Sequence, residues 1–122
     1  MSYRIGVFAS AALFAILAIA LLTAPALILF LFGLESNAEA TVMSNRAAAL
    51  FSGLFALAWL GRNVQNSETQ ILVLRTLSVT MAALILVGTY HLLSGQVGPG
   101  IMLALGGEAA FLVSYIYILR MI

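Results

Sequence analysis

Three ionisable residues lie inside segments that are otherwise apolar: Arg46, His91 and Glu108. A charged side chain at the centre of a membrane helix costs roughly 2.5–3.5 kcal/mol on insertion scales, so such a residue usually has a partner or a function. Arg46 and Glu108 have opposite charges and can form a buried ion pair, with His91 as a hydrogen-bond partner. A structural ion pair is therefore our first interpretation of these residues.

Two functional alternatives stay open for the same residues. Arg46, His91 and Glu108 could line a small polar pocket, together with Tyr115, that opens towards the outer leaflet and binds the head group of an amphipathic or anionic ligand. Alternatively, Glu108 could couple to the movement of protons or ions. The ion pair, the ligand pocket and the coupling site all require these side chains to face other helices rather than lipid.

Helical phase is compatible with such an inward orientation. At about 100° per residue, Glu108 shares its helix face with Ala104 and Tyr115, and His91 shares its face with Leu84. Both faces carry residues that suit packing against a neighbouring helix.

Arg75 is a further ionisable residue, close to the start of an apolar segment. It lies only about five residues from the start of its helix and points about 160° away from His91. We expect its side chain to extend to the phosphates of lipid head groups in the inner leaflet. A buried role is the alternative.

The composition indicates an integral membrane protein. Of the 122 residues, 64% are hydrophobic and 7% are charged, whereas about a quarter of a soluble domain is charged. The apolar residues form long unbroken runs, which are typical of helices that cross a bilayer. The length allows a single membrane domain over residues 1–122.

Several residue types are absent, which excludes whole classes of chemistry. The chain has no cysteine, no lysine, no aspartate and a single histidine. These absences exclude disulfides, thiolate metal sites, lysine Schiff bases, Ser/His/Asp catalysis and bis-histidine haem within one chain. The net charge of +1 gives no basic face for nucleic acid. We predict no metal site, no cofactor and no catalytic residues.

The hydropathy pattern predicts an all-α fold with four transmembrane helices, over residues 5–32, 44–61, 70–93 and 101–119. The first apolar segment resembles a secretory signal, but it continues past the only candidate cleavage site, so we expect an uncleaved helix with a kink at Pro25. The second predicted helix is short for a membrane span. Its charge-free part is about 22 Å long, against roughly 30 Å of hydrocarbon core.

The arginines predict the orientation of the four helices. Four of them fall on one side of the predicted membrane segments, and Arg46 alone falls towards the other; the four are Arg4, Arg62, Arg75 and Arg120. The positive-inside rule then places both termini in the cytoplasm. Aromatic residues near the same ends would form the cytoplasmic belt at the membrane interface; these are Tyr3, Trp59, Tyr115 and Tyr117.

The last helix carries a ridge of small residues, Gly107, Ala110 and Ser114, that suits contact with another protein. Our leading functional hypothesis is a non-enzymatic accessory or scaffolding subunit that forms a homo-oligomer or joins a larger membrane complex. The alternative is a binder or carrier of a hydrophobic or anionic amphipathic ligand, such as a lipid, quinone or pigment.

Residues 25–95 carry a pattern of mostly apolar motifs. Pro25 is followed by Phe32-Gly33-Leu34, an arginine with small residues (Arg46-Ala47-Ala48-Ala49), the segment Ala58-Trp59-Leu60-Gly61-Arg62, and Arg75. The pattern resembles a family of short bacterial membrane proteins catalogued as a domain of unknown function, which is distantly similar to DoxX-type proteins. The resemblance implies a four-helix architecture in the bacterial inner membrane, and it implies no particular activity.

Overall fold

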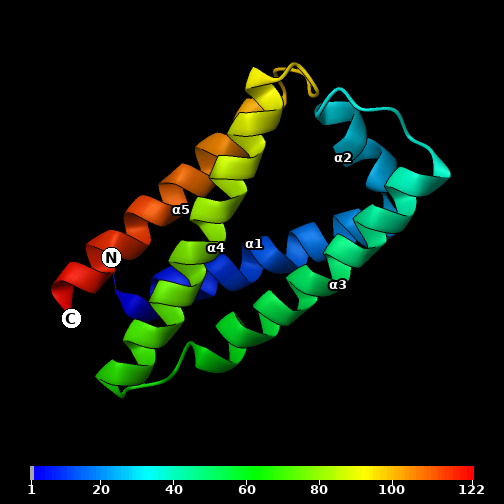
Figure 1. Ribbon diagram of the computed structural model, residues 1–122. Helices are drawn as coiled ribbons and strands as arrows, with labels where there is room; N and C mark the ends of the chain where they lie inside the picture. Colours follow the sequence, from blue (N-terminus) through cyan, green and yellow to red (C-terminus); the bar gives the residue numbers. More distant parts are fainter. Residues whose placement is uncertain (1) are drawn as a thin grey trace.

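The computed structural model describes residues 2–122, and the regular secondary structure of this part is entirely helical (Figure 1). The helices are α1 (Tyr3–Thr23), α2 (Pro25–Leu31), α3 (Ala38–Gly61), α4 (Ser67–Leu93) and α5 (Ile101–Met121). The predicted all-α fold is confirmed. Three of the described helices, α1, α4 and α5, are long and apolar enough to cross a membrane.

The first predicted helix is two helices rather than one kinked helix. The chain breaks at Ala24, where φ is −140° and ψ is 56°, and Pro25 is the first residue of α2. Proline has no backbone N–H, and its ring disfavours the helical conformation of the residue before it. The break lets α2 turn away from the axis of α1.

Helices α3 and α4 begin earlier than the hydropathy pattern indicates, at Ala38 and Ser67. An asparagine caps each N-terminus: Asn37 Oδ1 accepts from the N–H of Ala40 at 2.8 Å, and Asn66 Oδ1 accepts from the N–H of Glu68 at 2.9 Å. Capping satisfies N–H groups that lack a partner within the helix, so a polar segment can form the first turn. With 24 residues, α3 is about 36 Å long.

The long helices form two antiparallel pairs. Helix α1 packs along α3, and α4 packs along α5; contacts of α1 with α5 and of α3 with α4 join the pairs. Helices α3 and α5 make almost no direct contact. Figure 1 shows that α1 begins and α5 ends at the same end of the molecule, which is also where the loop between α3 and α4 lies.

The apolar core lies in that half of the molecule, which we call the packed half. It combines the first half of α1, the last turns of α3 and α5, and the first half of α4. Its fully buried side chains include Val7, Phe14, Leu74, Leu77 and Ile118. Beyond this core the two helix pairs diverge, so the other half of the molecule is less tightly packed.

Backbone contacts between two loops close the other end of the molecule, which we call the loop end. The N–H of Gly98 donates to the carbonyl oxygen of Phe32 at 2.7 Å. Gly33 has a φ of +72°, which a glycine adopts without strain. A Cβ atom at Gly100 would overlap the carbonyl oxygen of Leu31, so only glycine allows this approach of α5 to α2.

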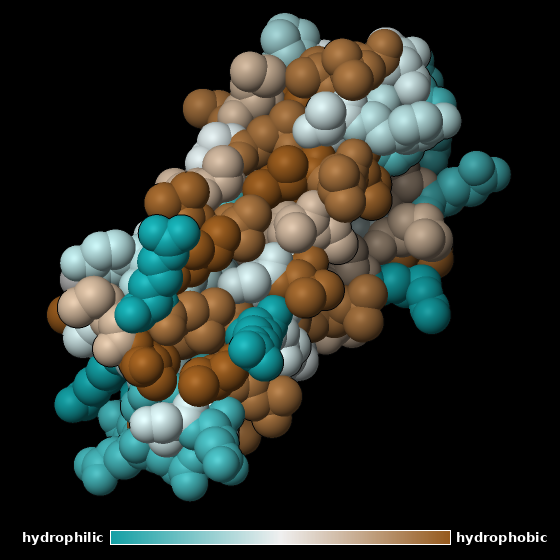
Figure 2. Space-filling model, turned by 60° about the vertical axis from the view of Figure 1, so that its left-hand side comes forward, coloured by the Kyte–Doolittle hydropathy of each residue, from teal (hydrophilic) through white to brown (hydrophobic). Residues whose placement is uncertain are grey.

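The surface between the two ends is mainly apolar. Figure 2 shows brown, hydrophobic side chains over the middle of one face, interrupted by single hydrophilic side chains, and a group of hydrophilic side chains at its lower end. Large apolar residues such as Leu50, Leu60, Leu86 and Leu103 are exposed on the helices. Exposure of this kind suits a lipid environment and agrees with an integral membrane protein.

Candidate functional site

A cavity of about 350 Å³ lies between the diverging helix pairs, and we call it the central cavity. All five helices contribute to its wall, and nearly all of the lining side chains are aliphatic or aromatic. The cavity exists because α1 and α3 separate from α4 and α5 beyond the packed half. Helix α2 and the residues after it cover its far side through Ile28 and Phe32.

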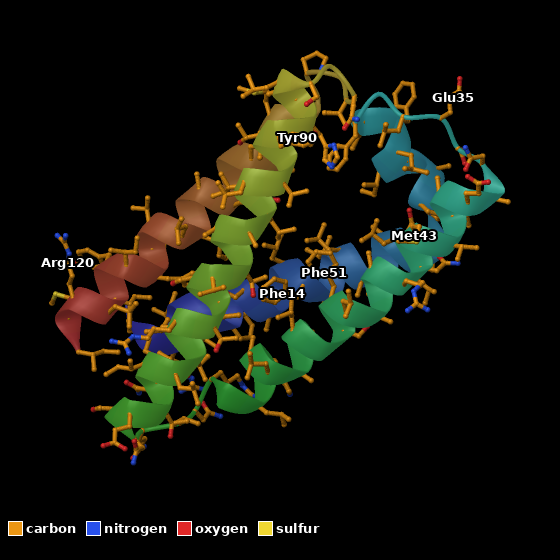
Figure 3. All side chains as sticks on the ribbon, in the orientation of Figure 1. Phe14, Glu35, Met43, Phe51, Tyr90 and Arg120 are labelled. Carbon is orange, nitrogen blue, oxygen red and sulfur yellow. The ribbon has the colours of Figure 1, made fainter. Side chains whose placement is uncertain are left out.

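Two stacked phenylalanines form part of the wall near the packed half. The rings of Phe14 on α1 and Phe51 on α3 have their centroids 6.0 Å apart at an angle of 26°. Figure 3 shows these two labelled side chains next to each other between α1 and α3. Met81 and Leu84 of α4 line the cavity as well. Most of this wall therefore offers apolar contacts to anything that enters the cavity.

Glu108 on α5 is the one charged residue that lines the central cavity within residues 2–122. Its Oε2 atom is buried and has no hydrogen-bond partner. A buried polar group without a partner costs about 1–3 kcal/mol, and more when it is charged. A carboxyl group in this state is therefore suited to hydrogen bond with a molecule that occupies the cavity.

The structure does not bring Arg46 to Glu108. The side chain of Arg46 is exposed on α3, and Glu108 Oε2 is unpartnered. The physical reason is the pairing of the helices: α3 packs on α1 and α5 packs on α4, so the two residues belong to helices that hardly touch. The residue next to Arg46 on the chain, Ala47, faces the central cavity instead.

His91 lies in a second hollow of about 220 Å³, the outer cavity, close to the loop end. Glu108, Phe32, Leu84 and Ala104 line both the central and the outer cavity, so the two adjoin. His91 Nδ1 is hydrogen bonded to the side-chain oxygen of Gln96. The structure thus brings His91 and Glu108 to one cavity, whereas Arg46 is not part of it.

Tyr115 lies in the packed half, about two helical turns from Glu108. Its side chain is 0% exposed, and its hydroxyl is 2.5 Å from the hydroxyl of Ser10 on α1. Ser10 in turn donates to the carbonyl oxygen of Gly6 at 2.9 Å, so Tyr115 is the donor in the first bond. Tyr115 joins α5 to α1 and does not line the central or the outer cavity.

Two of the residues expected in an interfacial aromatic belt are instead buried. Tyr115 is one, and Tyr3 is the other, with 8% of its surface exposed and its hydroxyl donating to the carbonyl oxygen of Gly61 at 2.8 Å. Trp59 and Tyr117 remain exposed. The guanidinium of Arg62 lies over the Trp59 ring, 3.6 Å from its centroid, as a cation–π contact.

Arg75 is exposed on α4. Contact between its side chain and lipid head groups stays a prediction. Neither the central nor the outer cavity includes it.

The two adjoining cavities offer hydrogen bonding and charge pairing through two titratable side chains. Within residues 2–122, no group of three or more metal-ligating side chains comes together. Glu108 and His91 are the titratable residues of the two adjoining cavities in the described chain. No known protein family, curated protein or solved structure gives a significant match to this chain.

Sequence reasoning missed Ser10 and the aromatic wall of the cavity. A serine within an apolar span needs a hydrogen-bond partner, so Ser10 carried a usable signal. The sequence gives no such indication for Phe14 and Phe51, because an apolar side chain in a membrane helix can face lipid, the core or a cavity with the same sequence pattern.

Proposed function

We propose that this protein binds an elongated apolar molecule between its helices and recognises the polar head of that molecule through Glu108. The observation that carries the proposal is the buried, unpartnered Oε2 of Glu108 at the edge of an apolar cavity of about 350 Å³. Ligand sites combine an apolar wall with a few polar groups that fix orientation, and this cavity has that composition.

The exposed position of Arg46 decides which charge the head group of the ligand can carry. An anionic head group would need a cation in the cavity, and Arg46 is exposed elsewhere on α3. The proposed ligand is therefore apolar with a neutral or cationic polar group, and lipids, quinones and pigments that meet this condition stay within the proposal.

The membrane arrangement is part of the same proposal. We place α3 as a fourth span beside α1, α4 and α5, because it lies antiparallel to α1 along most of its length. Cytoplasmic termini are then favoured by the exposed Arg4, Arg75 and Arg120 and the half-buried Arg62. The bacterial inner membrane is the location implied by the family resemblance.

Native mass spectrometry of the protein purified in mild detergent from its own host tests the proposal. The wild type should retain a small-molecule adduct of defined mass. Ala104→Trp should remove it, because Ala104 lines both the central and the outer cavity. Ala109→Trp is the matched control, since Ala109 is exposed on the same helix and lines neither cavity.

Two results would contradict ligand binding. One is the absence of any adduct from a folded wild-type preparation. The other is equal retention of the adduct by wild type, Ala104→Trp and Ala109→Trp, which would place the adduct on the outer surface. Ala47→Trp fills the same cavity from α3 and checks that loss of the adduct does not reflect damage to α5 alone.

An accessory or scaffolding subunit is the second candidate function. Gly53 and Gly106 have no neighbouring atom within 4 Å of where a Cβ atom would lie, and neither lines the central cavity. Such open glycine positions on α3 and α5 leave room for the close approach of helices from a second copy or a larger membrane protein. The same mass spectra would then show a defined oligomer or protein partner, with no small-molecule adduct.

A further inference from the structure

We infer that the ligand of the central cavity is a single-chain amphiphile whose head group is a protonated amine, bound between Glu108 and His91. This inference rests on the proposed function, and it specifies the class of ligand. It follows from the charges around the cavities, the hydrogen bond of His91 and the way three hollows connect.

Charge complementarity selects the head group. Within residues 2–122, neither the central nor the outer cavity is lined by an arginine, and the chain has no lysine. An anionic head group would lie beside Glu108 without a compensating cation. A neutral hydroxyl group could donate only one hydrogen bond and would bring no charge that complements the ionised form of the Glu108 carboxyl. A protonated amine supplies both a positive charge and several N–H donors, and such charge-assisted hydrogen bonds are the strong ones.

His91 adds a second acceptor in the outer cavity. The side-chain oxygen of Gln96 can only accept, so the Nδ1 atom of His91 is the donor in their hydrogen bond. In the neutral imidazole, Nε2 then carries the free lone pair. Glu108 and His91 both line the outer cavity, so an amine placed there meets one carboxylate and one imidazole acceptor.

The apolar tail has a continuous path from this head-group position to lipid. Glu108 and the Phe14 and Phe51 rings line the same central cavity. A lateral groove of about 490 Å³ runs between α3 and α4 and shares Ala47, Phe51 and Leu84 with the central cavity. A single alkyl chain can therefore follow the apolar wall and leave sideways into the bilayer.

Three probes with the same chain and different head groups test the inference. Radiolabelled dodecylamine, dodecanol and dodecanoate are titrated at neutral pH onto the protein in lipid nanodiscs, with empty nanodiscs subtracted. We expect saturable binding of dodecylamine that is at least about tenfold tighter than binding of the other two. Glu108→Gln should weaken dodecylamine by about tenfold or more and leave dodecanol within about twofold. Glu35→Gln, an exposed loop position, is the charge-matched control and should change nothing.

Each result distinguishes failure of the amine inference from failure of the proposed cavity. Equal or tighter saturable binding of dodecanol or dodecanoate, removed by Ala104→Trp, would overturn the amine head group and leave the cavity in place. If none of the three probes binds more tightly to the wild type than to Ala104→Trp, both the amine head group and the ligand cavity are overturned. The comparison of the three probes on the wild type gives an answer even if Glu108→Gln does not fold.

Discussion

At the scale of single residues, the hydrogen bond between Tyr115 and Ser10 joins α5 to α1 inside the packed half. Both side chains are fully buried, and the hydroxyl oxygens lie 2.5 Å apart. We expect Tyr115→Phe to lower the free energy of unfolding by roughly 0.5–1.5 kcal/mol. The effect should be seen in denaturation of the protein in bicelles, whereas Tyr117→Phe, at an exposed position, should have none.

A double-mutant cycle separates this bond from general packing. The loss in Ser10→Ala plus Tyr115→Phe should be smaller than the sum of the single losses by about 0.6 kcal/mol, the average for polar contacts between membrane helices. Additive effects would show that the two hydroxyls do not interact.

The sequence indicates which polar residues line the cavity, but it does not indicate which residues they contact. Glu108 and His91 were found from their cost in an apolar segment, and both line one cavity. Their pairing with Arg46 was not realised, because helical phase fixes the face of a residue but not which helix lies opposite. Pairing of α3 with α1 and of α4 with α5 is a tertiary choice that a single sequence does not reveal.

At the scale of elements, the loop end depends on close backbone approach between α2 and α5. Gly100→Ala should destabilise the protein by roughly 1–3 kcal/mol, since its Cβ atom would overlap the carbonyl oxygen of Leu31. Gly106→Ala is the control on the same helix, because no atom lies within 4 Å of its Cβ position. The control should be neutral or slightly stabilising in thermal unfolding. Equal stability of both variants would contradict the tight contact of α5 with α2.

The sequence predicts a helix end where glycine or proline interrupts the helix. It does not predict a helix start that depends on a side-chain cap. The ends of α3 at Gly61 and α4 at Leu93, and the start of α5 at Ile101, lie where the sequence indicated. Helices α3 and α4 start earlier than the sequence indicates, at Ala38 and Ser67. Asparagine caps extend each helix into polar residues that hydropathy assigns to a loop.

At the scale of the whole molecule, α3 decides whether the chain crosses the membrane four times. The chain has no cysteine, so single cysteines report their side of the membrane without background. With four spans, cysteines at Asn63 and Ile122 should be protected from an impermeant maleimide added outside cells, and those at Glu35 and Gln96 should react. Labelling at Asn63 together with Glu35 would show that α3 does not cross.

The central claim is that Glu108 holds a ligand in the cavity between the two helix pairs. A crystal structure in lipidic mesophase of protein purified from its own host tests it most directly. We expect elongated density along Phe14, Phe51 and Leu84, with its polar end within hydrogen-bond distance of Glu108 Oε2. A cavity closed by repacked side chains, or a Glu108 paired with Arg46, would contradict the claim.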